Sequence, residues 1–426
     1  MLDQINRFRK SKFVHNVAVV ATGTAGAQAI TMAFSPIITR LYGPESFGLL
    51  GTFMAVLTVA TPVAALSYPI AIVLPQKDSE AIGLAKLSAG LATAIAILLT
   101  FILLFLGDWI TDLVSLQNIG GFLILVPIAM LFSAFQQILQ QWLIRKKLFR
   151  ITARVAVFQS LILNTAKVGI GWFHPVGSIL IILATAGNAL HAILLCLNIS
   201  KSHNALPNKK MERTEDVQLK DVAWQFRDFP VYRAPQALIN ALSHSLPVLM
   251  LASFFGPVVA GYYALSKTVM SVPITLISKS VGDVFYPSIT EAHHRGENLY
   301  VLLLKTTISL FVIGFIPFGI VVVYGPFIFS FVFGPEWGEA GKYASWMAIW
   351  LFFGLLNRPS VVSLPIFNML DMFLVYEVVS VILRAIAVYV GLSFYGSAYA
   401  AVILFSLTGA LLNFSLIFFV LWKSKS

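Results

Sequence analysis

The chain has 426 residues, of which 58% are hydrophobic and only 11% are charged, and its formal net charge is +11. Its mean hydropathy is +0.86. Soluble domains carry about 25% charged residues, so this composition excludes a water-soluble enzyme, and its hydrophobicity excludes an intrinsically disordered chain. The positive charge favours a membrane protein with Lys and Arg in its cytoplasmic loops over a protein that binds nucleic acid.

Apolar runs long enough to cross the hydrocarbon core as helices, about 20 residues each, recur along the chain. They predict two sets of six spans, at about 14–39, 46–74, 82–106, 120–142, 151–171 and 176–199, and then at about 232–255, 258–285, 301–324, 340–357, 363–391 and 397–422. We therefore predict an all-α integral membrane protein with about 12 transmembrane helices. Its expected domains are an N-terminal six-helix lobe (1–199), a flexible cytoplasmic linker (200–229) and a C-terminal six-helix lobe (230–426).

Basic residues concentrate before the first span, after the fourth span and in the segment 200–229, whereas the alternate connections hold only Arg40 and Lys342. By the positive-inside rule, both termini and the linker are predicted to be cytoplasmic. The chain contains no Walker-type glycine loop, no H-E-x-x-H pair and no nucleophile elbow. We therefore expect neither ATP hydrolysis nor another enzymatic activity, and no bound metal or organic cofactor.

A short motif occurs once in each half, in residues 42–48 and 255–261. Each copy is an aromatic-Gly-Pro turn with a second Gly four residues beyond the Pro. Gly-Pro suits a helix-breaking turn, and the second Gly allows a neighbouring helix to approach closely. Because both helices of each hairpin begin on the same side, the repeat is parallel, and it predicts two lobes related by a pseudo-two-fold axis along the membrane normal.

The helices before these two turns carry polar side chains at helical spacing, so the polar groups share one face. Gln28 lies in the stripe of the first span, and Gln236 and Asn240 lie in that of the seventh. These amides are larger than residues that only join helices need to be, and we expect them to line a substrate cavity. The alternative is that the polar stripes hold adjacent helices together.

Ionisable residues inside a bilayer are costly and usually face a cavity or a partner. Lys267 lies about ten residues into the eighth span, too deep for its ammonium to reach the interface, and is expected to face a cavity. Lys167 lies nearer the end of the fifth span. Arg40 and Arg233 close opposite ends of the two polar stripes, as gate or headgroup contacts or as interfacial anchors. This excess of cations predicts an anionic cargo held by charge-assisted contacts.

The eleventh span carries Asp371, Glu377 and Arg384. A protonatable Glu377, with Asp371, would couple transport to an ion. Alternatively, Glu377 and Arg384 lie two helical turns apart on one face and pair structurally through an intermediate group. In the first case a proton or sodium gradient would drive transport.

Residues 35–48, Ser-Pro-Ile-Ile-Thr-Arg-Leu-Tyr-Gly-Pro-Glu-Ser-Phe-Gly, resemble the first-hairpin signature of bacterial polysaccharide-export flippases. Residues 261–273, Gly-Tyr-Tyr-Ala-Leu-Ser-Lys-Thr-Val-Met-Ser-Val-Pro, and 285–287, Phe-Tyr-Pro, resemble the second. Over its whole length the chain is similar to the O-antigen flippase (Wzx-like) branch of the multidrug/oligosaccharidyl-lipid/polysaccharide exporter superfamily. Lys267 and Arg40 occupy positions within these two motifs.

The resemblance implies a two-lobed protein of the bacterial inner membrane. Such a protein moves undecaprenyl-diphosphate-linked repeat units of O-antigen or exopolysaccharide from the cytoplasmic to the periplasmic leaflet by alternating access. Consumption of the transported product is the alternative to an ion gradient as the driving force. Its expected partners are this lipid-linked oligosaccharide and membrane lipids, with contacts to a polysaccharide polymerase and a chain-length regulator.

Three alternatives stay open. An ion-coupled multidrug antiporter of the same superfamily would favour acidic rather than basic cavity residues. A membrane polysaccharide polymerase would need long outer loops with catalytic groups, whereas the predicted outer connections are short. A scaffold for polysaccharide assembly would leave the polar stripes unexplained.

Overall fold

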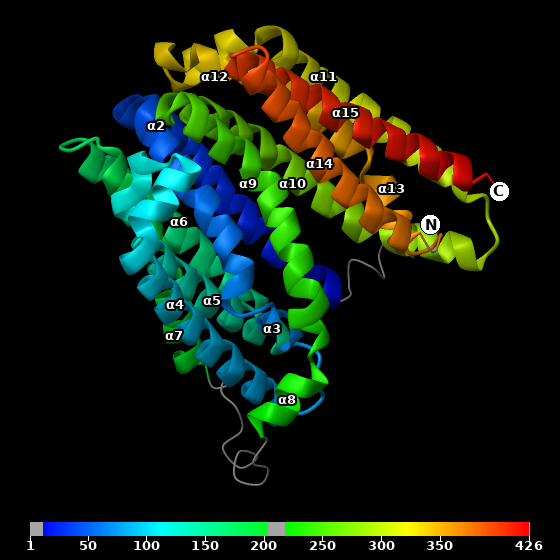
Figure 1. The fold of residues 1–426 in the computed structure, drawn as a ribbon. Coiled ribbons are helices and arrows are strands. Elements are labelled where there is room, and N and C mark those ends of the chain that lie inside the picture. Colours follow the sequence, from blue (N-terminus) through cyan, green and yellow to red (C-terminus); the bar gives the residue numbers. More distant parts are fainter. Residues whose placement is uncertain (1–11, 203–217, 368, 426) are drawn as a thin grey trace. The chain divides into compact units, whose positions relative to one another are not determined.

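The computed structural model describes residues 12–202, 218–367 and 369–425, and this part of the chain is helical without a strand (Figure 1). It forms two compact units. The first consists of Met1–Tyr42 and Leu49–Ser245, and the second of Gly43–Gly48 and Leu246–Ser426. Most of the predicted linker and the first basic residues lie outside the described residues, so the predicted lobe boundaries and the N-terminal charge pattern stay predictions.

The first unit contains most of α2 and all helices up to α8. Its long α2 (Lys12–Ala64) covers two predicted spans, which are separated at Gly43, the one non-helical residue inside it. Leu66 and Ser67 adopt positive φ, so the second of these helices ends earlier than the predicted residue 74. The following elements are α3 (Tyr68–Ala71), α4 (Asp78–Val114), η1 (Gln117–Phe122), α5 (Leu125–Arg145), α6 (Phe149–Gly171), α7 (Gly177–Lys201), α8 (Leu219–Gln225) and η2 (Phe229–Arg233).

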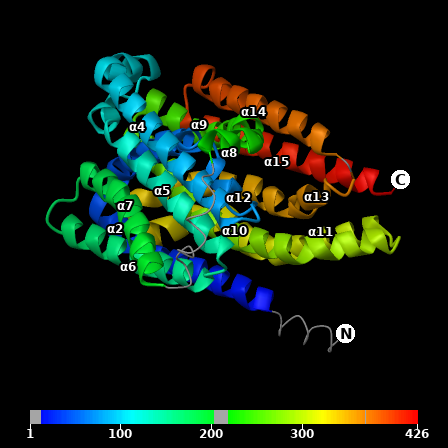
Figure 2. The same cartoon turned by 90° about the horizontal axis from the view of Figure 1, so that it is seen from below.

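Helix α9 (Ala234–Phe255) begins in the first unit and ends in the second. The second unit continues with α10 (Pro257–His294), α11 (Leu299–Phe333), η3 (Pro335–Trp337), α12 (Gly338–Leu356), α13 (Arg358–Ser363), α14 (Leu370–Ser393) and α15 (Ala398–Lys423). Helices α14 and α15 run side by side in both views of the molecule (Figures 1 and 2).

The predicted six-plus-six helix plan is confirmed. With α2 divided at Gly43, the described part of the chain contains twelve helices of 19 residues or more, six in each half of the sequence. Among the described residues, seven helical stretches, with α2 counted once, are by themselves long and apolar enough to cross a membrane. Their outer faces carry large apolar side chains, such as Phe105 (81% exposed) and Phe327 (69% exposed), which suits contact with lipid rather than water.

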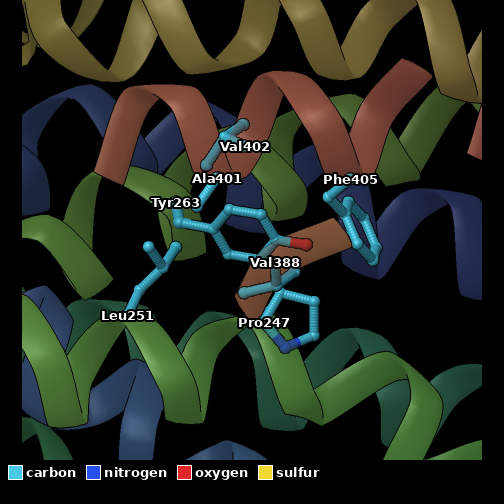
Figure 3. Close-up of a pocket in the computed structure, with 7 residues that line it drawn as sticks. All are labelled: Pro247, Leu251, Tyr263, Val388, Ala401, Val402 and Phe405. Carbon is cyan, nitrogen blue, oxygen red and sulfur yellow. The ribbon is translucent and has the colours of Figure 1, made fainter. Parts of the chain in front are cut away.

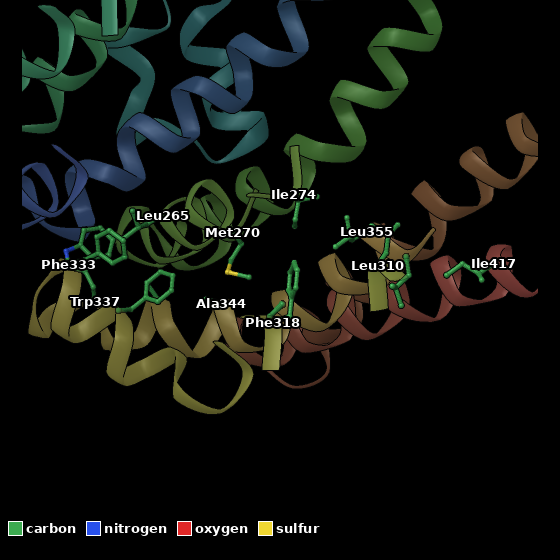
Figure 4. Packing of buried hydrophobic residues seen from close by; sticks show 14 residues of the cluster. Leu265, Met270, Ile274, Leu310, Phe318, Phe333, Trp337, Ala344, Leu355 and Ile417 are labelled. Carbon is green, nitrogen blue, oxygen red and sulfur yellow. The ribbon is translucent and has the colours of Figure 1, made fainter. Parts of the chain in front are cut away.

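Each unit has its own apolar core. In the second unit, buried residues of α10, α11, α12 and α15 form one cluster that extends from Trp337, which is 1% exposed, to Ile417 (Figure 4). In the first unit, a cluster that includes Ile72, Trp142 and Val222 joins α3, α4 and α5 to the short helix α8.

Candidate functional site: a cationic polar face on α10

The two Gly-Pro turns predicted from the sequence have the same backbone geometry. Gly43 has φ 67° and ψ 174°, and Gly256 has φ 82° and ψ −178°. Positive φ is a region that residues with a Cβ adopt rarely, so glycine is required at both turns. Each turn redirects the chain and is followed at once by the Pro that begins the next helical stretch.

The second Gly of each motif packs against the Pro of the other motif. A Cβ placed on Gly48 would overlap the carbonyl oxygen of Pro257, and one placed on Gly261 would overlap the carbonyl oxygen of Pro44. Both contacts lie inside the second unit, because the segment 43–48 belongs to it. The predicted close approach at these glycines is thus confirmed, and the two copies of the repeat are reciprocally interlocked.

An aromatic contact fixes the same segment. The Phe47 ring meets the Trp337 ring edge-on, with centroids 5.2 Å apart, and Tyr262 meets Trp337 in the same manner at 6.1 Å. Trp337 is buried in the core of the second unit. The first hairpin therefore inserts an aromatic side chain, as well as its backbone, into that core.

Part of the polar stripe on α2 joins this helix to α6. The hydroxyls of Thr31 and Ser160 are 3.0 Å apart, Asn164 donates to Thr31 Oγ1 at 3.2 Å, and Ser160 donates to the Ala27 carbonyl at 2.8 Å. At Thr31 the polar stripe therefore holds two adjacent helices together, which is the alternative to lining a cavity. Gln28 differs, because its Oε1 is buried and has no hydrogen-bond partner among the described residues.

Lys167 is half-buried on α6, three residues after Asn164. Its backbone carbonyl accepts a hydrogen bond of 2.9 Å from the hydroxyl of Tyr42, the residue before Gly43. The Tyr42 ring lies against Gly171, where a Cβ would come within 2.5–2.8 Å of the ring and its hydroxyl. The position of Lys167 is thereby coupled to the first Gly-Pro turn, a link that local sequence patterns do not show.

The other candidates of the first unit are exposed. Arg233 Nη1 donates to Gln236 Oε1 at 2.9 Å, so the structure brings these two predicted site residues together. Asn240 follows one turn later on α9 and is exposed, as is Arg40 near the end of the first part of α2. Lys267, Asp371 and Glu377 belong to the second unit.

Lys267 is half-buried on α10, ten residues after the helix begins, which corresponds to about 15 Å along its axis. Its neighbour Ser266 is fully buried and donates to the Ala340 carbonyl at 2.6 Å, which fixes α10 on α12. Ser271 and Thr275 continue the face of Lys267. Their hydroxyls donate to carbonyls of α10 itself, at 3.0 and 2.8 Å, and so keep lone pairs available.

Arg358 extends this face and was not among the predicted site residues. From α13, its Nε donates to Ser278 Oγ at 3.0 Å. We call Lys267, Ser271, Thr275, Ser278 and Arg358 the α10 polar face. It has a cation near each end and hydroxyls between them, an arrangement that suits an anionic group with attached hydroxyls. The helical spacing of the serines was visible in the sequence, but the contact with Arg358 is tertiary.

The carboxylates predicted to couple an ion lie on α14, where Glu377 is half-buried and Asp371 is exposed. The described residues contain no group of three or more His, Cys, Asp or Glu that could hold a metal ion. The ion-coupling role of the two carboxylates stays a prediction.

Comparisons with known proteins agree with this architecture. The model of a family described as polysaccharide biosynthesis protein matches residues 37–342. The amylovoran biosynthesis protein AmsL of Erwinia amylovora is 22% identical over 261 residues, which span 61% of this chain and 64% of that relative, slightly under two thirds of its length.

Two solved structures share the fold over nearly the whole chain. The lipid II flippase MurJ in an inward closed conformation has a TM-score of 0.72 at 14% identity, covering 95% of this chain and 87% of that chain. An inward-facing multidrug resistance MATE family transporter of the MOP superfamily has a TM-score of 0.70 at 11% identity, covering 93% and 94%. The chain therefore belongs to the polysaccharide biosynthesis protein family and has the fold of MOP-superfamily transporters.

Proposed function

We propose that the protein is a flippase for undecaprenyl-diphosphate-linked oligosaccharide repeat units, of an exopolysaccharide or O-antigen, and that it moves them from the cytoplasmic to the periplasmic leaflet by alternating access. The observation that carries the proposal is the α10 polar face, which presents Lys267 about 15 Å from the helix start and Arg358 at its far end. Family membership and the similarity to an amylovoran biosynthesis protein support a polysaccharide precursor as cargo.

The chemistry of the cargo matches this face. A diphosphate is a dianion or more, and its oxygens form short charge-assisted hydrogen bonds with ammonium and guanidinium groups. These bonds strengthen where water is scarce, as around the half-buried Lys267. The hydroxyls of Ser271 and Thr275 suit sugar hydroxyls, which both donate and accept hydrogen bonds. The isoprenoid tail stays in the lipid in this scheme.

The first unit contributes a second set of contacts in the proposal. The unpartnered Oε1 of Gln28 accepts from a sugar hydroxyl, and the exposed amides of Gln236 and Asn240 offer both donors and acceptors. Lys167, Arg40 and Arg233 add positive charge. We propose that cargo binding changes the balance between inward- and outward-open states, because the cargo binds one of these states more tightly than the other.

Energy comes from a proton or sodium gradient in this proposal. Asp371 and Glu377 are the candidate coupling carboxylates. The proposed site of action is the bacterial inner membrane, with both termini and residues 200–229 in the cytoplasm. A polymerase and a chain-length regulator act next on the flipped repeat unit and are the protein partners that we propose.

A multidrug antiporter is the second candidate, because one of the structures with the same fold is a multidrug resistance transporter. An organic cation would be repelled by Lys267 and Arg358, and the α10 polar face contains no carboxylate to offset them. Accumulation of cationic dyes in cells that express the protein distinguishes the two functions.

The proposal is tested in a bacterial strain whose polysaccharide export depends on this protein. Replacement of Lys267 by Ala is expected to abolish surface polysaccharide while leaving the amount of protein in the membrane unchanged. Lys305→Ala, at an exposed lysine of α11, is the matched control and is expected to export normally. Normal export by the Lys267→Ala variant would show that the α10 polar face does not take part in transport.

A further inference from the structure

The second unit holds a buried charge that the α10 polar face does not use. Arg384 lies on α14, within a stretch long and apolar enough to cross a membrane, and is half-buried. Its Nε is fully buried and has no hydrogen-bond partner among the described residues. A guanidinium carries five N–H donors and stays charged in proteins, so it requires a compensating group nearby.

The groups around Arg384 come from three helices. Its guanidinium carbon is 5.5 Å from the centroid of the Trp350 ring on α12, within the range of a cation–π contact. It interacts electrostatically with Tyr263 of α10 and with Tyr376 and Glu377 of α14. Among these groups Glu377 carries the one carboxylate.

Tyr263 is the member of this group from α10. Its ring packs among apolar side chains of α9, α14 and α15, which leave no room for a water molecule beside it (Figure 3). Its hydroxyl is buried without a hydrogen-bond partner in the described part of the chain, and no other residue lining the pocket has a polar side chain. Arg384 interacts electrostatically with this tyrosine.

The spacing on α14 explains the arrangement. Glu377 and Arg384 are seven residues apart, about 10.5 Å along the axis, and lie on the same face. Both residues are described in the structure, and no direct ion pair is recorded between their side chains. Tyr263 and Tyr376, which both interact electrostatically with Arg384, add neutral polar groups that lower the cost of holding charges in a poorly solvated interior.

We infer that Arg384 is the resident counter-cation of Glu377, and that with Tyr263 and Trp350 the pair forms a charge-balanced cluster joining α10, α12 and α14. The cluster needs no third ion. This narrows the ion-coupling proposal made above: Glu377 is then a structural carboxylate, and Asp371 stays the candidate coupling residue. This inference stands apart from the cargo proposal, since it concerns charge balance inside the second unit only.

The experiment is a double-mutant cycle on the full chain in lipid nanodiscs, read as the midpoint of thermal unfolding and therefore independent of transport. Glu377→Gln and Arg384→Gln are each expected to lower the midpoint by about 4 °C or more, because each leaves one charge uncompensated. The double variant is expected to recover most of the loss, and Arg384→Lys, which keeps the charge, to lose less than Arg384→Gln.

The matched control is the surface pair Glu339–Lys342 (2.6 Å), in which both side chains are about half exposed. Its two Gln variants and their double variant are expected to show no coupling. Where a single variant yields no folded protein, recovery of folding in the double variant has the same meaning as a recovered midpoint. Additive losses, a double variant that also fails to fold, or an unchanged midpoint in either single variant would each overturn the inference.

Discussion

Gly48 lies so close to the carbonyl oxygen of Pro257 that no side chain fits between them. Gly261 and Pro44 have the reciprocal relation, so each hairpin of the repeat accepts the backbone of the other. Where small residues let backbones meet in this way, helices pack through extensive van der Waals contact, which is the main source of helix association in lipid. This reciprocal packing is the most direct structural sign that the two copies of the repeat form one unit.

Replacement of Gly48 by Ala is expected to destabilise the protein by about 1–3 kcal/mol, because the added methyl group forces two backbones apart. Gly261→Ala is expected to behave in the same way. Thermal unfolding in nanodiscs measures both effects.

The control for the glycine variants is Gly90→Ala on α4, where a Cβ meets nothing within 4 Å. This change is expected to leave stability unchanged or slightly improved, because Ala is the better helix former. If Gly48→Ala and Gly90→Ala unfold at the same temperature, the hairpins do not interlock as described.

Removal of the Tyr42 hydroxyl, in Tyr42→Phe, is expected to cost about 1 kcal/mol, because the buried bond to the Lys167 carbonyl is lost. Tyr232→Phe, at a tyrosine that is 71% exposed, is the control and should be neutral. Export is expected to fall in Tyr42→Phe alone, since Lys167 loses its fixed position. If the two variants export equally, the role of Lys167 in export does not depend on its link to the first Gly-Pro turn.

Arg145 holds the segment between α3 and α4 in place through hydrogen bonds. Its Nε donates to Asp78 Oδ1 at 3.0 Å, and its other nitrogens donate to the carbonyls of Ile72, Pro75 and Gln76. Its side chain is 10% exposed. Arg145→Ala is expected to lower the free energy of unfolding by about 1.5–3 kcal/mol, because one charged hydrogen bond and several carbonyl contacts are lost together.

Denaturant unfolding measures this loss, and Arg154→Ala, at an exposed arginine of α6, is the control. Proteolysis between residues 72 and 78 is expected to speed up in Arg145→Ala and not in the control. An unchanged cleavage rate would show that Arg145 does not hold this segment.

Arg358 is predicted to act on cargo from the far end of the α10 polar face. Arg358→Gln should reduce export about tenfold, the effect of one lost charge-assisted hydrogen bond, with protein level unchanged. Arg295→Gln provides the comparison, because Arg295 is an exposed arginine of the same unit that pairs with Glu291 and Glu297. A larger loss of export in Arg295→Gln than in Arg358→Gln would assign the effect to surface charge.

The sequence was sufficient to predict the features that local patterns determine. Apolar run lengths predicted the helix plan, and the Gly-Pro motifs predicted both turns and the close approach at Gly48 and Gly261. The end of the second helix was predicted too late, because the positive φ angles of Leu66 and Ser67 leave no trace in hydropathy.

Side-chain partners could not be predicted, because they depend on tertiary packing. Thr31 and Ser160 are 129 residues apart in the sequence. Their contact places part of the predicted cavity face between two packed helices. Arg358 was visible only as a basic residue in a turn, and its contact with Ser278 spans 80 residues. For Glu377 and Arg384 the spacing was visible, but the presence of Tyr263 and Trp350 beside them was not.

The most direct test of the account is translocation by the purified protein in proteoliposomes loaded with a fluorescent undecaprenyl-diphosphate-linked oligosaccharide. Accessibility of the sugar to an enzyme added outside measures how fast it crosses the bilayer. We predict rapid crossing with the unaltered protein, nearly as rapid crossing with Lys267→Arg, and crossing at the protein-free rate with Lys267→Gln. Crossing at the full rate with Lys267→Gln, or at the protein-free rate with the unaltered protein under an imposed ion gradient, would contradict this prediction.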